Sequence, residues 1–155
     1  MVVPYKTTLL IINYGGTAFC STGTVQNFGT IIVSVLNPSV GFANYEGAVF
    51  NYGVISIINN AVGGTGFLNY FGTVYNGGVI AIVNNAISGT AFSNFGGTVN
   101  NYDGITISSN VAGYIGFDNS GTVSNHGTIN SCGSVGSGLI IESGSTYSGT
   151  PVISC

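Results

Sequence analysis

Charged side chains are almost absent from this sequence. Its 155 residues include one Lys or Arg, four Asp or Glu and one His, so charged residues make up 3% of the chain, against about a quarter of an ordinary globular domain. Phosphate binding needs several Lys and Arg, and Lys6 stands alone, which argues against nucleic acid as a partner. A surface with so little charge favours self-association.

Long apolar runs and Trp are also missing. The apolar runs at 9–12, 31–36 and 79–83 are far shorter than the roughly 20 residues of a membrane-spanning helix, so no membrane span is predicted. Asn13 and Gly15 follow the first short apolar stretch at once, which is unlike a secretory signal. We expect export to use a signal outside this sequence or another route.

The sequence does contain a repeat with a period of 25 residues. Phe42, Phe67, Phe92 and Phe117 are spaced by 25 residues, and each opens a similar segment, F-x-N-x-x-G-T-V-x-N-x-x-[GV]-I-x-I. A fainter copy begins at Phe19, and the opening residues resemble the closing part of a repeat. Self-similarity at a fixed period is typical of stacked repeat proteins.

Within a repeat, apolar and small residues alternate with period two, as in Ile55, Ser56 and Ile57, which predicts strands and excludes helices. Asn and Gly recur between the short runs and favour bends. The predicted fold is all-β: a right-handed parallel β-helix, or β-solenoid, with about 25 residues and three strands per coil, and five to six coils stacked about 4.8 Å apart. We divide the chain into a partial N-terminal coil or assembly strand (1–18), the repeats (19–131) and a degenerate Ser/Gly-rich terminal coil (132–155).

Equal spacing predicts that equivalent residues stack in columns. Three apolar columns are expected to point inward and to supply the main stabilising term: Phe19, Phe42, Phe67, Phe92 and Phe117; Val25, Val49, Val74, Val99 and Val123; and Ile31, Ile55, Ile80, Ile105 and Ile129. Two Asn columns at the bends are expected to form hydrogen-bonded ladders: Asn27, Asn51, Asn76, Asn101 and Asn125; and Asn44, Asn69, Asn94 and Asn119.

Outward columns are the candidate contact surface. Thr24, Thr73, Thr98 and Thr122 form a Thr column interrupted by Ala48. Exposed aromatic patches often mark contact surfaces, and the candidate residues are Tyr45, Tyr70 and Phe95, with Phe50 and Tyr75, together with the apolar outer positions Val54, Val79, Ile58 and Val83. We expect another copy, or the N-terminal strand of the same chain, to pack on them; the alternative is cover by a loop or by the Ser-rich tail.

The ends of such a stack leave open sheet edges, which soluble solenoids usually protect with charges, Pro or a capping helix. Here Lys6 and Pro4 near one end and Glu142 and Pro151 near the other are the few residues of that kind. We therefore expect edges to pair between subunits, because end-to-end contacts that do not close produce filaments.

The three cysteines have no metal-ligand spacing with His126, so no metal site is predicted. Cys132 and Cys155 are 23 residues apart, close to one coil, which makes them a candidate disulfide in an oxidising compartment. Cys20 is left over, either as a buried small hydrophobic residue or as a partner for a terminal Cys of a neighbouring subunit.

Enzymatic chemistry is not expected. Glu46, Asp103 and Asp118 fall at different positions of the repeat, His126 has no acid at the matching site, and no nucleophile signature accompanies a Ser. We predict no catalytic residue and no cofactor.

The segments GTVQNFGTI at 23–31 and GTVSNHGTI at 121–129 resemble the N-x-G-T-[IV] repeats of bacterial and archaeal surface β-helices, including autotransporter passengers and haemagglutinin-like adhesins. The resemblance covers roughly residues 19–130 and implies an extracellular or cell-surface protein with a structural or adhesive role.

Two functions of different classes follow. The first is a structural subunit of a self-assembling extracellular filament, whose partner is the same chain. The second is an adhesin-like module that binds glycan or a host surface through its Tyr, Phe and Thr columns. Ice binding by the Thr column is a third, but that activity needs paired ranks of Thr and the sequence contains one rank.

Overall fold

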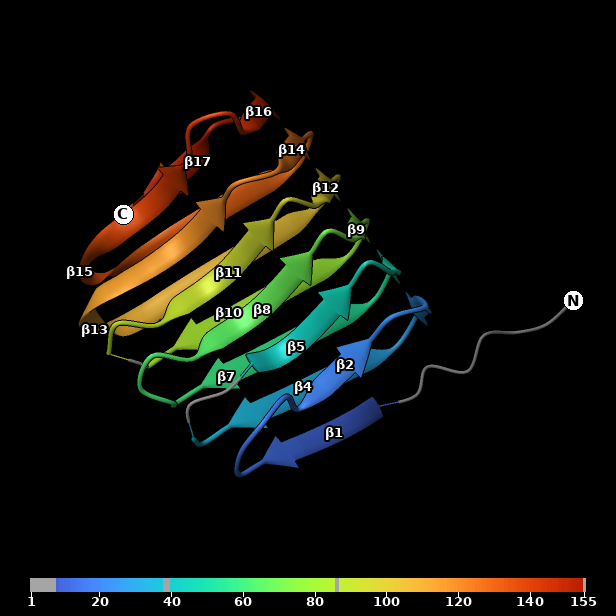
Figure 1. Cartoon of the computed structure of the whole chain (residues 1–155), viewed down its shortest axis with the longest axis vertical. Helices are drawn as coiled ribbons and strands as arrows, with labels where there is room; N and C mark the ends of the chain where they lie inside the picture. The colour runs from blue at the N-terminus through green and yellow to red at the C-terminus, as the bar shows by residue number, and fades with distance from the viewer. Residues whose placement is uncertain (1–7, 38–39, 86, 155) are drawn as a thin grey trace, which may run out of the picture.

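The described part of the chain is a β-solenoid. The computed structural model describes residues 8–37, 40–85 and 87–154, with the backbone alone for 134–139. Within these residues the chain forms seventeen β-strands and no helix. The strands stack in parallel into about six turns of about 24 residues each (Figure 1), which confirms the predicted all-β solenoid.

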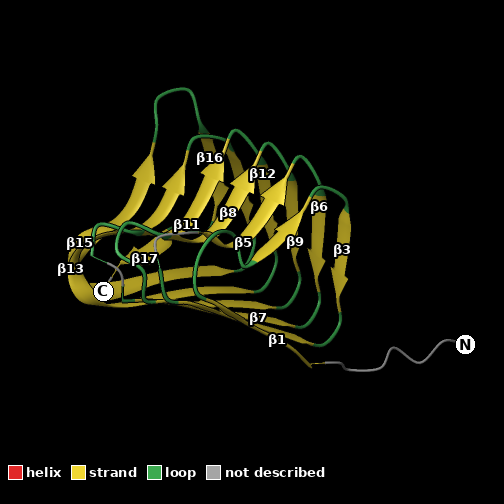
Figure 2. Ribbon diagram, turned by 60° about the horizontal axis from the view of Figure 1, so that its bottom comes forward, coloured by secondary structure: helices red, strands yellow, loops and turns green. Residues whose placement is uncertain are grey.

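Each turn has three sides, as Figure 2 shows from an oblique direction. We name them the Phe, Val and Ile faces after the apolar column that each contributes. The Phe face contains β2 (Phe19–Ser21), β5 (Val40–Tyr45), β8 (Thr65–Tyr70) and β11 (Thr90–Phe95). The Val face contains β3 (Thr24–Asn27), β6 (Ala48–Asn51), β9 (Thr73–Asn76), β12 (Thr98–Asn101), β14 (Thr122–Asn125) and β16 (Thr146–Gly149).

The Ile face contains β1 (Thr8–Asn13), β4 (Thr30–Val35), β7 (Val54–Asn59), β10 (Val79–Asn84) and β17 (Val152–Ser154). The long strands β13 (Gly104–Asn119) and β15 (Thr128–Ile141) run from the Ile face into the Phe face of the following turn. They join these two faces into one eleven-stranded sheet, while the Val face is a separate six-stranded sheet. Three strands per turn were predicted, and the structure confirms them.

The register places like residues over one another. Phe42 pairs with Phe67, which pairs with Phe92, and neighbouring rings along the Phe column stack with centroids 4.5–4.8 Å apart. The Val and Ile columns are continuous in the same way. Since side chains of a strand alternate between its two sides, one register fixes every inward column at once.

These three columns form the core. Phe67, Val74, Val99, Ile80 and Ile105 are fully buried. The Ile face adds a further inward column that the repeat pattern also contains, Val33, Ile57, Ile82 and Ile107. Phe19 and Val25, in the first turn, are half buried and pack against the core from one side.

The predicted Asn ladders are present and lie inside the molecule. Within each ladder the amide donates from Nδ2 to Oδ1 of the Asn in the next turn until the last Asn, for example from Asn51 to Asn76 at 2.8 Å and from Asn69 to Asn94 at 2.8 Å. The same Nδ2 also bonds a backbone carbonyl, that of Val79 for Asn51. Buried amides need such partners, so these Asn residues are structural.

Glycine is required at bends where successive turns approach most closely. A Cβ on Gly78 would overlap the carbonyl oxygen of Gly53, and a Cβ on Gly53 would overlap that of Gly29. The backbone of one turn therefore lies directly on that of the next, with no room for a side chain between them.

Candidate assembly surfaces

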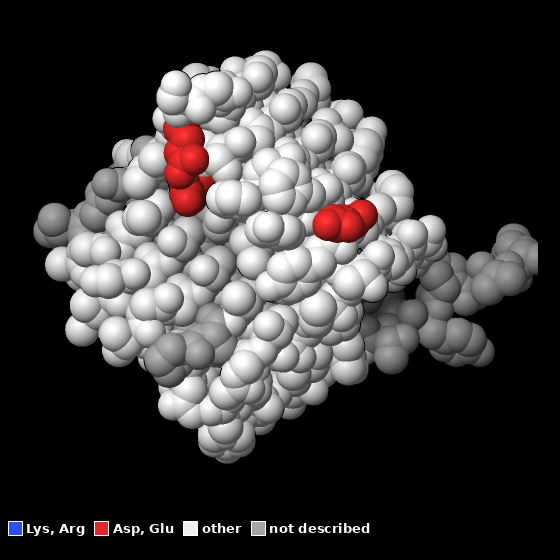
Figure 3. Space-filling model, in the orientation of Figure 1, with Lys and Arg blue, Asp and Glu red and all other residues white. Residues whose placement is uncertain are grey.

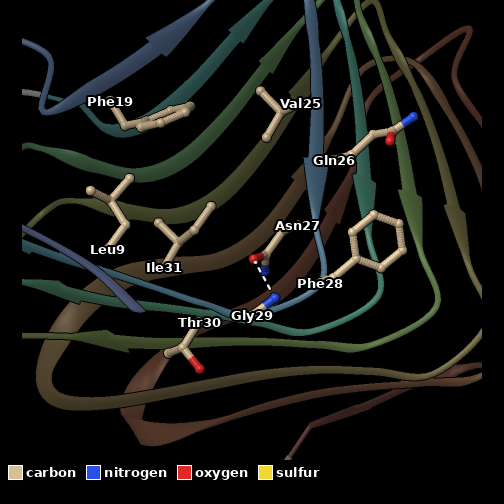
Figure 4. Close-up of a pocket in the computed structure, with 9 residues that line it drawn as sticks. All are labelled: Leu9, Phe19, Val25, Gln26, Asn27, Phe28, Gly29, Thr30 and Ile31. Carbon is tan, nitrogen blue, oxygen red and sulfur yellow. Dashed lines mark hydrogen bonds between the residues drawn. The ribbon is translucent and has the colours of Figure 1, made fainter. Parts of the chain in front are cut away.

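The N-terminal end of the solenoid is an open apolar hollow. It has a volume of about 300 Å³ and is lined chiefly by the first-turn residues Phe19, Val25 and Ile31, with Leu9 of β1. Figure 4 shows Leu9, Phe19, Val25 and Ile31 on the inner side of β3, with Gln26 and Phe28 on its other side. No described residue covers this side of the first turn, so the hollow lies where the described hydrophobic core begins.

The strands around this hollow have free edges within the described residues. β1 pairs with β4, β2 with β5 and β3 with β6, each on one side. On β1 the exposed fraction is 45% for Leu9, 60% for Leu10 and 56% for Ile12. An exposed, uncharged, apolar edge strand readily pairs with another strand.

The C-terminal end differs because Tyr147 covers it. Tyr147 takes the position of the Val column in the last turn, above Val123, and packs against the core. Its hydroxyl accepts a hydrogen bond from Nδ2 of Asn125 (3.0 Å) and donates to the carbonyl of Thr150 (2.5 Å). Burial raises the pKa of this phenol, an effect that the bond from Asn125 partly offsets. The hydroxyl takes the place of a further Asn, so one ladder ends with a satisfied donor.

On the outer surface, a first aromatic ladder consists of Tyr45, Tyr70, Phe71 and Phe95. Tyr45 pairs with Tyr70 and Tyr70 with Phe95, and the Tyr70 and Phe95 rings stack at 5.2 Å. Phe71, which sequence reasoning missed, contacts both rings edge-on. The ring of Phe71 lies where a Cβ on Gly96 would be, so Gly96 makes room for it. Mutual packing leaves Tyr45 and Tyr70 half buried and Phe95 exposed.

A second aromatic ladder consists of Phe50, Tyr75, Tyr102 and His126. Phe50 lies beside Tyr75, Tyr75 stacks on Tyr102, and Tyr102 stacks on His126. The hydroxyls of Tyr75 and Tyr102 share a hydrogen bond of 3.1 Å, which raises the pKa of Tyr102, with smaller effects from desolvation and from the charge of Tyr75. The sequence assigned Phe50 and Tyr75 to the surface but missed Tyr102, because Tyr102 belongs to a different column of the repeat from Tyr75.

The other outward columns are also where they were predicted. Thr73 and Thr98 are half buried on the Val face, and Thr24 and Thr122 are exposed. Val79 and Ile58 are exposed on the Ile face, and Val54 and Val83 are half buried there. The strand β1 continues the Ile face, so this described part of the N-terminal segment does not pack over the aromatic columns; residues 1–7 of that segment lie outside the described residues.

The direction of Cys20 follows from the alternation of inward and outward side chains along β2. Phe19 points inward, so Cys20 points outward and is a free, exposed thiol. The prediction that Cys20 is a buried small hydrophobic residue is therefore wrong. The candidate disulfide joins Cys132 to Cys155, and Cys155 lies outside the described residues, so this pairing stays a prediction.

Among the acidic residues, Asp118 and Glu142 lie near each other. Desolvation, and secondarily the charge of Glu142, raises the pKa of Asp118; the sequence did not show this proximity because Glu142 follows the last clear repeat. Figure 3 shows acidic side chains at two separate places on an otherwise uncharged face. His126 bonds to the Ser124 hydroxyl at 3.0 Å, and the described residues contain no group of three potential metal ligands. Nor do they contain a helix long and apolar enough to cross a membrane.

Comparison with known proteins gives no relative: no family model matches this chain, and no curated protein or solved structure matches it.

Proposed function

We propose that this protein is a structural subunit of an extracellular filament or surface fibre that assembles from copies of the same chain. The observation that carries the proposal is the N-terminal end, where an apolar hollow is bordered by three strands whose outer edges lack a partner in the described chain. Water contact with this end is costly, since unpaired edges and apolar core residues both gain from pairing with another chain.

The outer aromatic ladders supply a second contact. Phe95 and Tyr102 are each 47% exposed. Each ring stacks on a neighbouring aromatic ring, which restricts its motion. Rigid aromatic surfaces lose little conformational entropy on association. Packing of one solenoid against another along these ladders, combined with pairing at the ends, produces a fibre in which few charges oppose close approach.

Sedimentation velocity and negative-stain electron microscopy over a concentration series test the proposal. We expect elongated assemblies that grow with concentration, and purified material that stays monomeric at high concentration would refute it. The informative variant is Leu10→Lys with Ile12→Lys, because charges on an exposed edge strand oppose pairing. Ser108→Lys is the matched control, since Ser108 is an exposed position of β13, whose neighbours on both sides are already paired.

Glycan or host-surface binding is the second candidate, favoured by the Tyr hydroxyls that the ladders present beside the Thr column. Here Tyr45→Ala, Tyr70→Ala and Tyr75→Ala should reduce binding to a glycan panel without changing assembly. Isotherms unaffected by these three substitutions would remove this candidate.

A further inference from the structure

We infer that Tyr75 and Tyr102 are a modification site, at which one-electron oxidation joins the two phenol rings into an intrachain dityrosine. The inference goes beyond the proposed assembly, because it concerns two side chains of one chain and holds whether or not that chain associates. The modified protein carries a covalent bond between successive turns of the solenoid.

The first argument is the distance between the two phenols. Their ring centroids lie 5.0 Å apart with an interplanar angle of 27°, and the Tyr75 hydroxyl donates to the Tyr102 hydroxyl over 3.1 Å. The two hydroxyls therefore lie at the same edge of the stack. The ring carbons beside them, where a phenoxyl radical carries much of its unpaired electron density, lie across the stack from each other.

The register explains why these two rings meet. Tyr75 is an outward residue of β9, and its partner in β12 is Asn100, so its own column has no ring in the next turn. Tyr102 follows β12 at the position that Gly77 takes after β9, so its own column has no ring in the preceding turn. Each ring therefore lacks a neighbour of its own column on the side where the other ring lies.

Neighbouring rings hold the pair in place. Phe50 lies beside Tyr75 with a centroid distance of 6.0 Å, and His126, one turn further on, stacks on Tyr102 at 5.2 Å. Groups that are held in contact react as if at high concentration, because the entropy of bringing them together has already been lost. We expect coupling within this pair to be faster than coupling between chains in dilute solution.

The pair is accessible to an oxidant at the surface. Tyr102 is 47% exposed and Tyr75 is half buried. The oxidant required is a haem peroxidase acting with hydrogen peroxide. Each phenol loses one electron and one proton and becomes a phenoxyl radical, and the peroxide takes up both hydrogen equivalents and is reduced to water.

The coupling step then needs no further reagent. The two radicals form one carbon–carbon bond between the ring carbons beside their hydroxyls. That bond forms perpendicular to the ring planes, which is the direction in which stacked rings face each other. Each of these two carbons then releases its hydrogen as a proton while the adjacent oxygen gains one, so both phenols are restored. The net change in the chain is the loss of two hydrogen atoms.

A second tyrosine pair shows a less suitable geometry. Tyr45 and Tyr70 occupy one column, but their centroids are 5.5 Å apart and their rings are inclined by 55°. In the part of the chain that the structure describes, no hydrogen bond joins these two hydroxyls. Because inclined rings do not present their faces to each other, we expect this pair to couple less than Tyr75 and Tyr102.

The link would stabilise turns that disulfides cannot join. Residues 21–131 contain no Cys. Tyr75 and Tyr102 are 27 positions apart in the sequence, so a bond between them closes a loop of the unfolded chain and lowers its entropy, as a disulfide does. The modification therefore favours the folded solenoid.

The experiment oxidises the purified full chain with haem peroxidase and hydrogen peroxide and isolates the single-chain band from a denaturing gel, so that links between chains are removed. Chymotrypsin cleaves after Phe92 and Phe95, between the two tyrosines, and mass spectrometry then detects a link as two joined peptides. We expect Tyr75 joined to Tyr102. Tyr75→Phe and Tyr102→Phe should each lose most of the dityrosine fluorescence of this band.

Tyr45→Phe is the matched control, because it removes a hydroxyl from the other aromatic ladder and keeps the ring; it should retain the fluorescence. Equal fluorescence in Tyr75→Phe and in the unsubstituted chain would overturn the inference. A single-chain band in which other tyrosines are linked but Tyr75 and Tyr102 are not would also overturn it, as would oxidation that yields no dityrosine.

A second measurement concerns stability. The oxidised chain should unfold at a temperature roughly 10 °C higher than the untreated chain, whereas oxidised Tyr75→Phe should show little change from its untreated form. An equal rise in both proteins would contradict a link at this pair.

Discussion

The two ends of this solenoid differ in how far the hydrophobic core is covered by side chains. At the C-terminal end, Tyr147 replaces a Val of the repeat, covers the core with its ring and satisfies the last Asn of a ladder with its hydroxyl. At the N-terminal end, Phe19 and Val25 remain half buried around a hollow. The comparison shows that a single Tyr at a Val position covers the core of the last turn, whereas no described residue covers Phe19 and Val25 in the first turn.

The largest expected effect comes from removing a Phe ring of the Phe column, once in the interior and once at the N-terminal end, and comparing the losses of unfolding free energy. Phe92→Ala deletes a fully buried ring stacked on both sides and should cost about 3–5 kcal/mol of unfolding free energy. Phe19→Ala deletes a half-buried ring stacked on Phe42 alone and should cost less than half of that. Urea unfolding measures both, and equal losses would mean that the N-terminal end is not open.

Tyr147→Ala should convert the closed end into a second open end. Loss of the ring and of two hydrogen bonds is expected to cost about 2–3 kcal/mol and to create new association through the C-terminal end. Tyr147→Phe is the control: it keeps the ring, loses the hydroxyl and should cost about 1 kcal/mol without new association. Urea unfolding and sedimentation velocity measure the two effects, and an uncapped variant with unchanged assembly would argue against the capping role.

The Asn ladders allow the same comparison between an interior turn and the N-terminal end. Asn76→Ala removes both a donor to Asn101 and an acceptor from Asn51, and should cost about 2 kcal/mol or more because buried groups are left unpaired. Asn27→Ala, at the open end, removes a donor to Asn51 but no acceptor from a preceding Asn, and should cost about half as much. Urea unfolding should rank the two variants in this order; the reverse order would contradict the ladder.

The smallest expected effect concerns Asp118, on the Phe face near the C-terminal end. Desolvation and Glu142 raise the pKa of Asp118 in the folded chain, so the folded state binds a proton more tightly than the unfolded state. Stability should therefore increase as the pH falls from neutral through this raised pKa towards the ordinary Asp value of about 4.

Asp118→Asn should stabilise the protein at neutral pH and should abolish the increase in stability that protonation of Asp118 gives at lower pH. Asp103→Asn, at an exposed bend, is the matched control and should leave it in place. Thermal unfolding between pH 4 and 7 measures the effect, and an unchanged pH profile in Asp118→Asn would contradict the assigned environment.

The repeat alone was sufficient to predict the interior. Because Phe42, Phe67 and Phe92 recur at one spacing, a single assumption about stacking fixes the core columns, the buried Asn ladders and the outward Tyr positions. The sequence could not show contacts that break the column rule. Tyr75 reaches Tyr102 across columns, and Phe71 leans over Gly96 from a bend with φ of 50°.

The structure of the two ends was harder to predict from the sequence, because the repeat is least regular there. Tyr147 looked like part of a Ser-rich tail, and its capping role follows only from its register with Val123. Burial was one of the two alternatives for Cys20, and it is wrong because the alternation set by the inward-pointing Phe19 directs Cys20 outward.

Hydrogen exchange at increasing protein concentration tests the central claim most directly, because amides at an assembling edge become protected when their partner strand arrives. The account predicts concentration-dependent protection in β1 and β3, with β16 and β17 unchanged. Protection that develops at β16 and β17 while β1 and β3 continue to exchange would contradict it.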